Sequence, residues 1–153
     1  MARATFNALV FPYYITPDRQ IDYAVFNRSD AVEDFWQAIS GGGEDDETPL
    51  EAARRESWEE AGISPESSFI ALDSMTTIPV YHYGYTWDKD TYVVSEYSFG
   101  VQVEDRSLRL SHEHTEYRWL DFQAATEILK FDSNKNALWE LDQRLHRMLQ
   151  KES

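Results

Sequence analysis

The chain has 153 residues with 28 Asp and Glu against 14 Lys and Arg, which gives a formal net charge of −14 at pH 7. This balance argues against a nucleic-acid polymer as partner, because phosphate contacts need clustered Lys and Arg. The absence of cysteine excludes disulfide bonds and thiolate metal sites. No apolar run is as long as a membrane span and no signal pattern begins the chain, so we expect no membrane partner and a cytoplasmic protein. The length suits one domain over residues 1–153.

The first part of the chain predicts strands. Residues 3–14 and 21–27 are rich in aromatic and β-branched residues and flank a turn at residues 16–19. A short apolar run at residues 35–39 predicts a further strand that leads into Gly41, Gly42 and Gly43. We expect these glycines to form a loop in which the backbone turns tightly.

A well-specified helix follows the glycines. Thr48 can cap its N-terminus, Pro49 suits its first position, and Glu51 completes a Thr-x-x-Glu capping box. Gly62 stands where a left-handed residue commonly ends a helix. A stripe at three- and four-residue spacing predicts the buried face: Leu50, Ala53, Ser57 and Ala61.

Three carboxylates of this helix, those of Glu56, Glu59 and Glu60, share an arc of roughly 100° and can converge on one point. Two like charges about 4 Å apart repel by about 4 kcal/mol at an effective dielectric constant of about 20. A folded protein tolerates such a cluster if water or a cation screens it, and oxygen ligands suit Mg²⁺ or a similar hard cation. Arg55 lies four residues before Glu59 and is placed to hold that carboxylate.

The second half of the chain contains both strand and helix patterns. We expect strands at residues 68–76, 78–87, 92–103 and 117–120, and helices near residues 122–130 and 134–150. In the last helix the apolar stripe consists of Leu138, Leu141, Leu145 and Met148. Strands on both sides of one helix, with further helices at the end, predict an α/β fold with a mixed sheet between helices.

The segment from Gly41 to Ile63 resembles the signature box of the Nudix hydrolases. The family pattern is G-x5-E-x7-R-E-U-x-E-E-x-G-U, with U a bulky aliphatic residue, and the chain reads GGGEDDETPLEAARRESWEEAGI. Every glycine and charged position is matched, and Ser57 departs from the usual aliphatic residue. A solvated acidic helix after a flexible loop is the plain alternative. The resemblance implies the Nudix-type α/β/α sandwich.

Segments outside the box resemble the bacterial branch that cleaves nucleoside or pterin triphosphates, the dATP and dihydroneopterin triphosphate pyrophosphohydrolases. They are residues 26–30 (FNRSD) with 34–37 (DFWQ), and residues 112–120 (HEHTEYRWL). By position, Glu113 is similar to a glutamate that lies on a loop facing the box helix and helps to bind metal in that branch. Its neighbours His112 and His114 suit Mg²⁺ poorly, so we expect them to be polar loop residues.

The resemblance implies a set of site residues. Metal binding and catalysis fall to Glu56, Glu59, Glu60 and Glu113, with Mg²⁺ as cofactor and Mn²⁺ as the alternative. Structural support falls to Gly41, Glu47, Arg55 and Gly62. Substrate contacts fall to Arg28, Gln37, Gly42 and Glu96.

Two of these substrate residues have a second interpretation. An arginine at position 28 can fork onto a phosphate or be a plain surface charge. Glu96 can point into the cleft as a ligand or base, or pair only with a neighbouring strand.

The implied reaction is hydrolysis of a phosphoanhydride bond in a small phosphorylated substrate, with a carboxylate as base for the attacking water. Glu56, Glu96 and Glu113 are all candidates for that base. The first expectation for the substrate is a nucleoside or dihydroneopterin triphosphate. Pro79 and Tyr81 stand near marker positions of branches that act on ADP-ribose or dinucleoside polyphosphates, which are the alternative.

A non-catalytic nucleotide sensor is the alternative of a different class. That interpretation goes with lost box residues, and none of the charged ones is missing here. The sequence leaves a monomer and a homodimer equally open.

Overall fold

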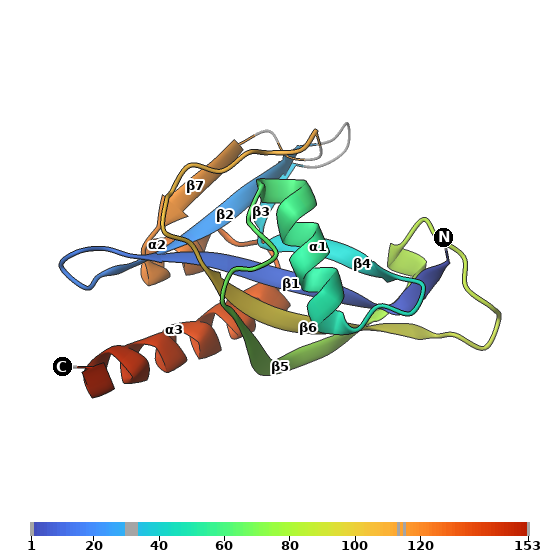
Figure 1. Ribbon diagram of the computed structural model, residues 1–153. Helices are drawn as coiled ribbons and strands as arrows, with labels where there is room; N and C mark the ends of the chain where they lie inside the picture. The colour runs from blue at the N-terminus through green and yellow to red at the C-terminus, as the bar shows by residue number, and fades with distance from the viewer. Residues whose placement is uncertain (1, 30–33, 113, 115, 153) are drawn as a thin grey trace.

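The computed structural model describes residues 2–29, 34–112, 114 and 116–152. The strands are β1 (Arg3–Ile15), β2 (Ile21–Ser29), β3 (Asp34–Gln37), β4 (Ile39–Glu44), β5 (Phe69–Pro79), β6 (Val93–Gln102) and β7 (Glu116–Leu120). The helices are α1 (Pro49–Ala61), the 3-10 helix η1 (Val80–His82), α2 (Phe122–Ile128) and α3 (Asp132–Glu152). Figure 1 shows α1 and α3 on opposite faces of one sheet, so the expected α/β/α sandwich with a mixed sheet is confirmed.

The sheet is organised around β1. Its strand order is β3-β2-β1-β6-β5, while β4 pairs with β1 and β7 pairs with β2. β1 runs parallel to β6, with Phe6 opposite Ser95 and Tyr13 opposite Gln102. Along its other edge, β1 pairs antiparallel with β4 through residues 3–10 and with β2 through residues 13–15. Among the described strands, β4 pairs only with β1, so its outer side is an edge of the sheet.

Alternation along β1 supplies both layers of the core. Leu9 and Phe11 point toward α3, and Ala8 and Val10 point toward α1. The apolar stripe of α3 is confirmed, since Leu138, Leu141 and Leu145 are fully buried and Met148 packs at their margin. Of the helices within the described ranges, none combines the length and apolar character that crossing a bilayer requires.

The ends of α1 are as the capping residues predict. The Thr48 hydroxyl accepts the Glu51 N–H at 3.2 Å, and the Glu51 carboxylate accepts the Thr48 N–H at 2.8 Å. Gly62 ends the helix in the left-handed region with φ 69°. The buried face differs from the expectation, because Leu50 is 38% exposed and Ala52 is buried in its place. Small residues here let the helix lie close to the sheet.

The three box glycines form a strand, so the expectation of a tightly turning loop is wrong. Gly41 pairs with Ala8 and Gly42 with Asn7, and only Gly62 among the described glycines has a positive φ. These positions exclude a side chain because neighbouring groups occupy the space of a Cβ. The groups are the Glu56 carboxylate at Gly41, the Arg3 guanidinium at Gly42 and the Phe6 ring at Gly43.

Residues 78–87 do not form the expected strand. β5 ends at Pro79, which has no N–H to extend the ladder, and η1 follows it. The Val80 N–H donates to the Tyr92 carbonyl at 3.0 Å, which closes the base of a loop that leads to β6. Tyrosine is common in strands, but Tyr81 and Tyr92 are largely exposed here.

Candidate active site

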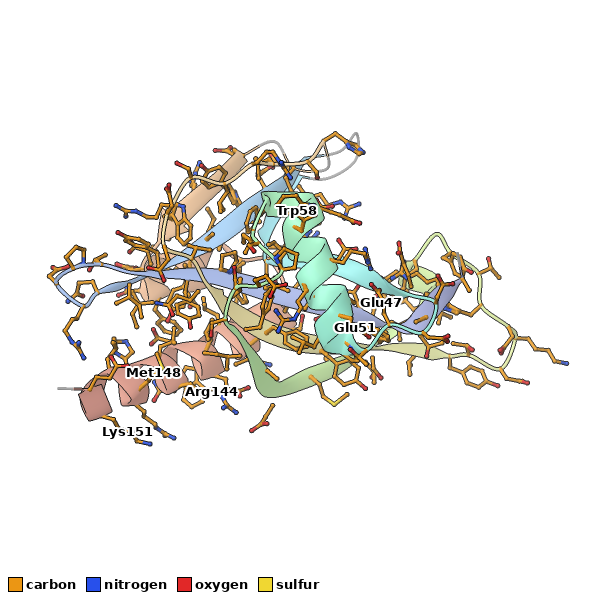
Figure 2. All side chains as sticks on the ribbon, in the orientation of Figure 1. Glu47, Glu51, Trp58, Arg144, Met148 and Lys151 are labelled. Carbon is orange, nitrogen blue, oxygen red and sulfur yellow. The ribbon has the colours of Figure 1, made fainter. Side chains whose placement is uncertain are left out.

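The glutamates of α1 lie beside β4, the strand that contains the three box glycines and is called the glycine strand below. Figure 2 shows Glu51 at the N-terminal end of the helix and Trp58 further along it, with Glu47 on the segment that precedes it. Glu56 and Glu60 are only 8% and 5% exposed, and the Glu56 carboxylate lies against Gly41. Burying two carboxylates is costly unless each has a charged or hydrogen-bonding partner. The groups around these two carboxylates therefore decide how they are tolerated in the fold.

Arg55 ties the start of α1 to β4. Its guanidinium holds Glu47 through two contacts, Nε to Oε2 at 2.8 Å and Nη2 to Oε1 at 3.0 Å, and Nη2 also donates to the Gly42 carbonyl at 2.8 Å. Glu47 in turn accepts the Glu44 N–H at 2.9 Å. The hydrogen bond from Arg55 lowers the pKa of Glu47, and the same contact raises the pKa of Arg55. Glu47 and Arg55 thus occupy the supporting positions expected from the box.

Arg55 also touches two of the three box carboxylates. Nη1 lies 2.9 Å from Glu56 Oε1 and 3.2 Å from Glu59 Oε2, the second contact being the one that the four-residue spacing predicts. Burial raises the pKa of Glu56 to about 7, since the pull of Arg55 is opposed by the charges of Glu59 and Glu60. A bound cation would favour the ionised form of such a carboxyl group. These oxygen donors, with one carboxyl group whose ionisation burial disfavours, therefore fit a hard cation.

Glu60 is held by the segment that follows β6. The Ser111 hydroxyl donates to Glu60 Oε2 at 2.6 Å, and His114 Nδ1 lies 3.2 Å from the same oxygen. His114 is buried against the Phe26 ring, 5.4 Å away, whereas His112 is exposed as expected of a loop residue. This arrangement brings Ser111 and His114 to α1. Glu113, which stands between them in the sequence, lies outside the described residues.

The three box glutamates do not converge on one point in this conformation. Across the described residues, no group of three or more carboxylate, histidine or cysteine side chains is close enough to hold a metal. Glu56 turns to Arg55, Glu60 turns to Ser111, and the Glu59 side chain is 50% exposed. Mutual repulsion and separate hydrogen-bond partners account for this spread.

The two expected substrate residues near β3 differ in exposure. Arg28 pairs with Phe35 and is half-buried, and the alternation of β2 places it on the same face as Phe26, toward α1. Gln37 pairs with Phe26 and is buried, and its Nε2 has no hydrogen-bond partner among the described residues. A buried amide donor left without a partner is costly, which suits a position that meets an anionic ligand.

A cavity of about 430 Å³ opens on the α3 side of the sheet, between β5, β6 and the start of α3. Glu96 lines it together with Ser98, Ser133 and Asn136. Glu96 is buried, and its Oε1 makes no hydrogen bond of good geometry to a described residue. Burial raises the pKa of Glu96, against hydrogen bonds from Asn7 and Ser133 that lower it. The α1 glutamates do not line this cavity.

A short polar path joins the cavity to the glycine strand. The Asn7 side-chain amide donates to Glu96 Oε2 at 3.1 Å and to the Ser40 hydroxyl at 2.8 Å. Ser40 precedes Gly41, beside which the Glu56 carboxylate lies. Sequence reasoning missed Asn7, although a polar residue inside an otherwise apolar strand was an available signal. It also missed Ser111, for which the sequence offered none.

Comparison with known proteins agrees with the box. The family model for the NUDIX domain matches residues 14–141. A dihydroneopterin triphosphate diphosphatase of Haemophilus influenzae is 31% identical over 109 residues, which cover 69% of each chain. A bis(5'-nucleosyl)-tetraphosphatase [asymmetrical] of Rattus norvegicus is 29% identical over 143 residues, covering 92% of this chain and 93% of the other.

The solved structures show the same relationship. The crystal structure of a Listeria monocytogenes protein assigned to the NUDIX hydrolases superimposes with a TM-score of 0.82 at 39% identity. The alignment covers 93% of this chain and 94% of the other. Since the family model spans most of the residues and the signature helix stands where that fold requires it, this chain belongs to the NUDIX hydrolase family.

Proposed function

We propose that this NUDIX hydrolase is a Mg²⁺-dependent pyrophosphohydrolase of a nucleoside or dihydroneopterin triphosphate, with Mn²⁺ as the substitute ion. The observation that carries the proposal is the burial of Glu56 and Glu60, with the Glu56 carboxylate in the space that the missing side chain of Gly41 leaves on β4. Arg55 is shared among Glu47, Glu56 and Glu59, so it cannot neutralise the cluster alone. The Haemophilus influenzae relative, a dihydroneopterin triphosphate diphosphatase, supports the substrate class.

The ion would be held by Glu56, Glu59, Glu60 and Glu113. When bound, it neutralises charge on the phosphates and lowers the pKa of a bound water. The chain's own contribution is placement, since Arg55 fixes two of these carboxylates and Ser111 fixes Glu60. The missing Cβ of Gly41 leaves room for the Glu56 carboxylate.

Glu56 and Glu113 are the candidates for the base that takes the proton of the attacking water. Burial raises the pKa of Glu56 to about 7 without an ion, and a bound ion would favour the ionised carboxylate that a base requires. Glu96 lies on the α3 side of the sheet, away from α1, so we assign it to substrate binding. Its cavity is within the usual size of small-molecule sites, roughly 300–1,000 Å³, and offers a place for the base or pterin ring.

The phosphate chain would run between these two places. Gln37 offers a buried donor that no group in the described part of the chain accepts, and Arg28 lies on the α1 face of β2 near the same strands. Both suit contacts to phosphate oxygens, which accept such donors. The Gly42 carbonyl accepts a hydrogen bond from Arg55, and the space left by its missing side chain is filled by the Arg3 guanidinium.

The test is a substrate panel with Mg²⁺ on the wild type, Glu59→Gln and Glu51→Gln. We expect pyrophosphate release from a triphosphate and a loss of roughly 10- to 100-fold or more in Glu59→Gln, because ligand and near-ligand positions control metal affinity. Glu51→Gln removes the same charge from the same helix but keeps the capping box, so it should stay near wild type. Near-normal turnover in Glu59→Gln would show that the ligand assignment is wrong.

A dinucleoside polyphosphate is the second candidate substrate. The similarity to the Rattus norvegicus tetraphosphatase spans 92% of this chain and favours it. The products separate the two candidates, because a triphosphate gives pyrophosphate and a monophosphate, whereas a dinucleoside tetraphosphate gives two nucleotides. Binding of these compounds without release of any product would instead identify a nucleotide sensor.

A further inference from the structure

Arg3, at the start of β1, has its guanidinium beside two aromatic rings of the loop that follows η1, which contact each other edge to face. The guanidinium carbon lies 5.1 Å from the centre of the Tyr83 ring and 5.5 Å from that of Trp87. The Trp87 indole N–H donates to the Arg3 carbonyl at 3.2 Å, which fixes this loop to the strand. Such stacking holds an arginine plane in place while its N–H groups stay available for a ligand.

The Arg3 guanidinium has no anionic partner in the described part of the chain. Its Nε is buried and makes no hydrogen bond to any residue that the structure describes. This is unusual in a chain with 28 acidic residues and 14 Lys and Arg, where the cation could readily have been paired. Arg106 offers the contrast, since it stacks on Tyr14 at 4.8 Å and also pairs with Asp22 at 2.9 Å. A partly buried cation without a counter-charge is a place for an anion from outside the chain.

The guanidinium lies on the same face of the sheet as the cavity, although Arg3 does not line the cavity itself. The Arg3 backbone pairs with Glu44, but the side chain lies back over Gly42, which itself pairs with Asn7. Asn7 holds Glu96, the carboxylate in the cavity. Burial and the charge of Glu96 raise the pKa of Tyr83 and the charge of Arg3 lowers it, as expected if the Tyr83 ring lies near both groups.

Arg3 and Glu56 lie on opposite sides of the same strand. The Glu56 carboxylate fills the space of a Cβ at Gly41, and the Arg3 guanidinium fills that space at Gly42. Successive residues of a strand face opposite ways and are only about 3.3 Å apart along it. Since β4 is an edge strand, an extended ligand that crosses its outer side can reach both groups.

We propose that Arg3 binds a phosphate of the substrate on the α3 side of β4, between the bond cleaved near Glu56 and the ring held in the Glu96 cavity. This assignment rests on the proposed function for the identity of the ligand. The planar guanidinium matches two phosphate oxygens at once, and the aromatic rings keep it in that orientation. Arg3 is then a binding residue whose loss acts on substrate affinity rather than on the chemical step.

The first test compares Arg3→Met and Arg3→Lys with the wild type and with Arg106→Met as matched control. The measurements are KM and kcat for GTP and dihydroneopterin triphosphate, and the Kd of inorganic tripolyphosphate with Mg²⁺ by calorimetry. A lost hydrogen-bonded contact to a charged group predicts a rise of roughly 10- to 100-fold in KM and Kd for Arg3→Met, with kcat changed little. Arg3→Lys should lie between, and Arg106→Met should match the wild type. Unchanged KM and Kd in Arg3→Met overturn the proposal.

The second test uses Gly42→Ala, which displaces the guanidinium without removing it. We expect Gly42→Ala to raise the Kd of tripolyphosphate and to add nothing further in the double variant with Arg3→Met. A full additional loss in the double variant overturns the proposal, because the two changes would then act separately. If the wild type hydrolyses no triphosphate but Arg3→Met still loses tripolyphosphate binding, the proposed function fails and the anion site stands.

Discussion

At the scale of single residues, the site depends on where a side chain is absent. Gly41 has an ordinary extended backbone, so its value lies in the space beside it rather than in its conformational freedom. The Glu56 carboxylate occupies that space and from there reaches Arg55. A glycine is thus part of the carboxylate site without contributing an atom to it.

Gly41→Ala should lower activity more than stability. The new methyl group would overlap the Glu56 carboxylate, which is the far end of a flexible side chain and can move away. Displacing a group that orients the ion is expected to cost roughly 10- to 100-fold in metal affinity or activity. The measurements are kcat/KM and the Mg²⁺ concentration for half-maximal rate, with a thermal melt for stability. Gly84→Ala is the control, because no atom of the residues that the structure describes lies within 4 Å of its added Cβ. Equal activity in both variants would contradict the assignment.

At the scale of elements, α3 is fastened to an irregular part of β5. The ladder between β5 and β6 shifts register between Ala71 and Met75. The backbone N–H groups of Asp73 and Ser74 donate instead to Glu140 of α3, at 2.8 and 2.7 Å. Arg144, labelled on α3 in Figure 2, completes the cluster by pairing with Glu140 at 2.7 Å. A helix side chain thereby satisfies donors that the bulged strand leaves free.

Glu140→Gln should destabilise the fold in a pH-dependent way. Burial alone would raise the pKa of Glu140, but hydrogen bonds from Asp73, Ser74 and Arg144 lower it to about 2. The pKa of a glutamate in the unfolded chain is about 4.3, so the ionised Glu140 stabilises the fold above that pH. This contribution is lost as the pH falls toward about 2. Removing it should cost roughly 1–3 kcal/mol at pH 7.

The measurement is the free energy of urea unfolding between pH 7 and pH 3. The difference between the wild type and Glu140→Gln should shrink below about pH 4.3. Glu127→Gln, on the exposed side of α2, removes one charge without these contacts and serves as control. A difference that stays constant over the whole range would rule out the ionised cluster as its source.

At the scale of the whole molecule, one sheet separates two apolar layers that differ in the size of their side chains. The layer under α1 is closed by alanines, whereas the layer under α3 is closed by leucines. Leu141 is fully buried and fits against Gly100, where a Cβ would overlap it. Packing of this density leaves little room for rearrangement after a deletion.

Leu141→Ala should therefore lower the free energy of unfolding by about 2–5 kcal/mol, because a cavity remains in the layer under α3. Leu50→Ala removes the same atoms from α1, but Leu50 is 38% exposed and the change should stay within about 0.5 kcal/mol. Chemical denaturation of both variants measures the two values. Similar losses would mean that Leu50 packs against the core, as the helical spacing alone predicts.

Local patterns predicted what depends on neighbours in the sequence. The capping of α1, the contact of Arg55 with Glu59 and the stripe of α3 all follow from spacing within one helix. The contacts of Asn7 with Glu96 and of Ser111 with Glu60 join residues 89 and 51 positions apart, so only the assembled sheet reveals them. The stacking of Arg3 could not be predicted for the same reason, because its aromatic partners lie about 80 positions away in the chain.

The parallel pairing of β1 with β6 has a consequence for folding during synthesis. The N-terminal strand leaves the ribosome first, yet the neighbour that completes its other flank is encoded about ninety residues later, as the pairing of Phe6 with Ser95 shows. At a synthesis rate of about 5–20 residues per second, that edge of β1 waits roughly 5 to 20 s with its backbone N–H and C=O groups unpaired. Until β6 has been translated, this edge of β1 is therefore open to pairing with a strand of another chain.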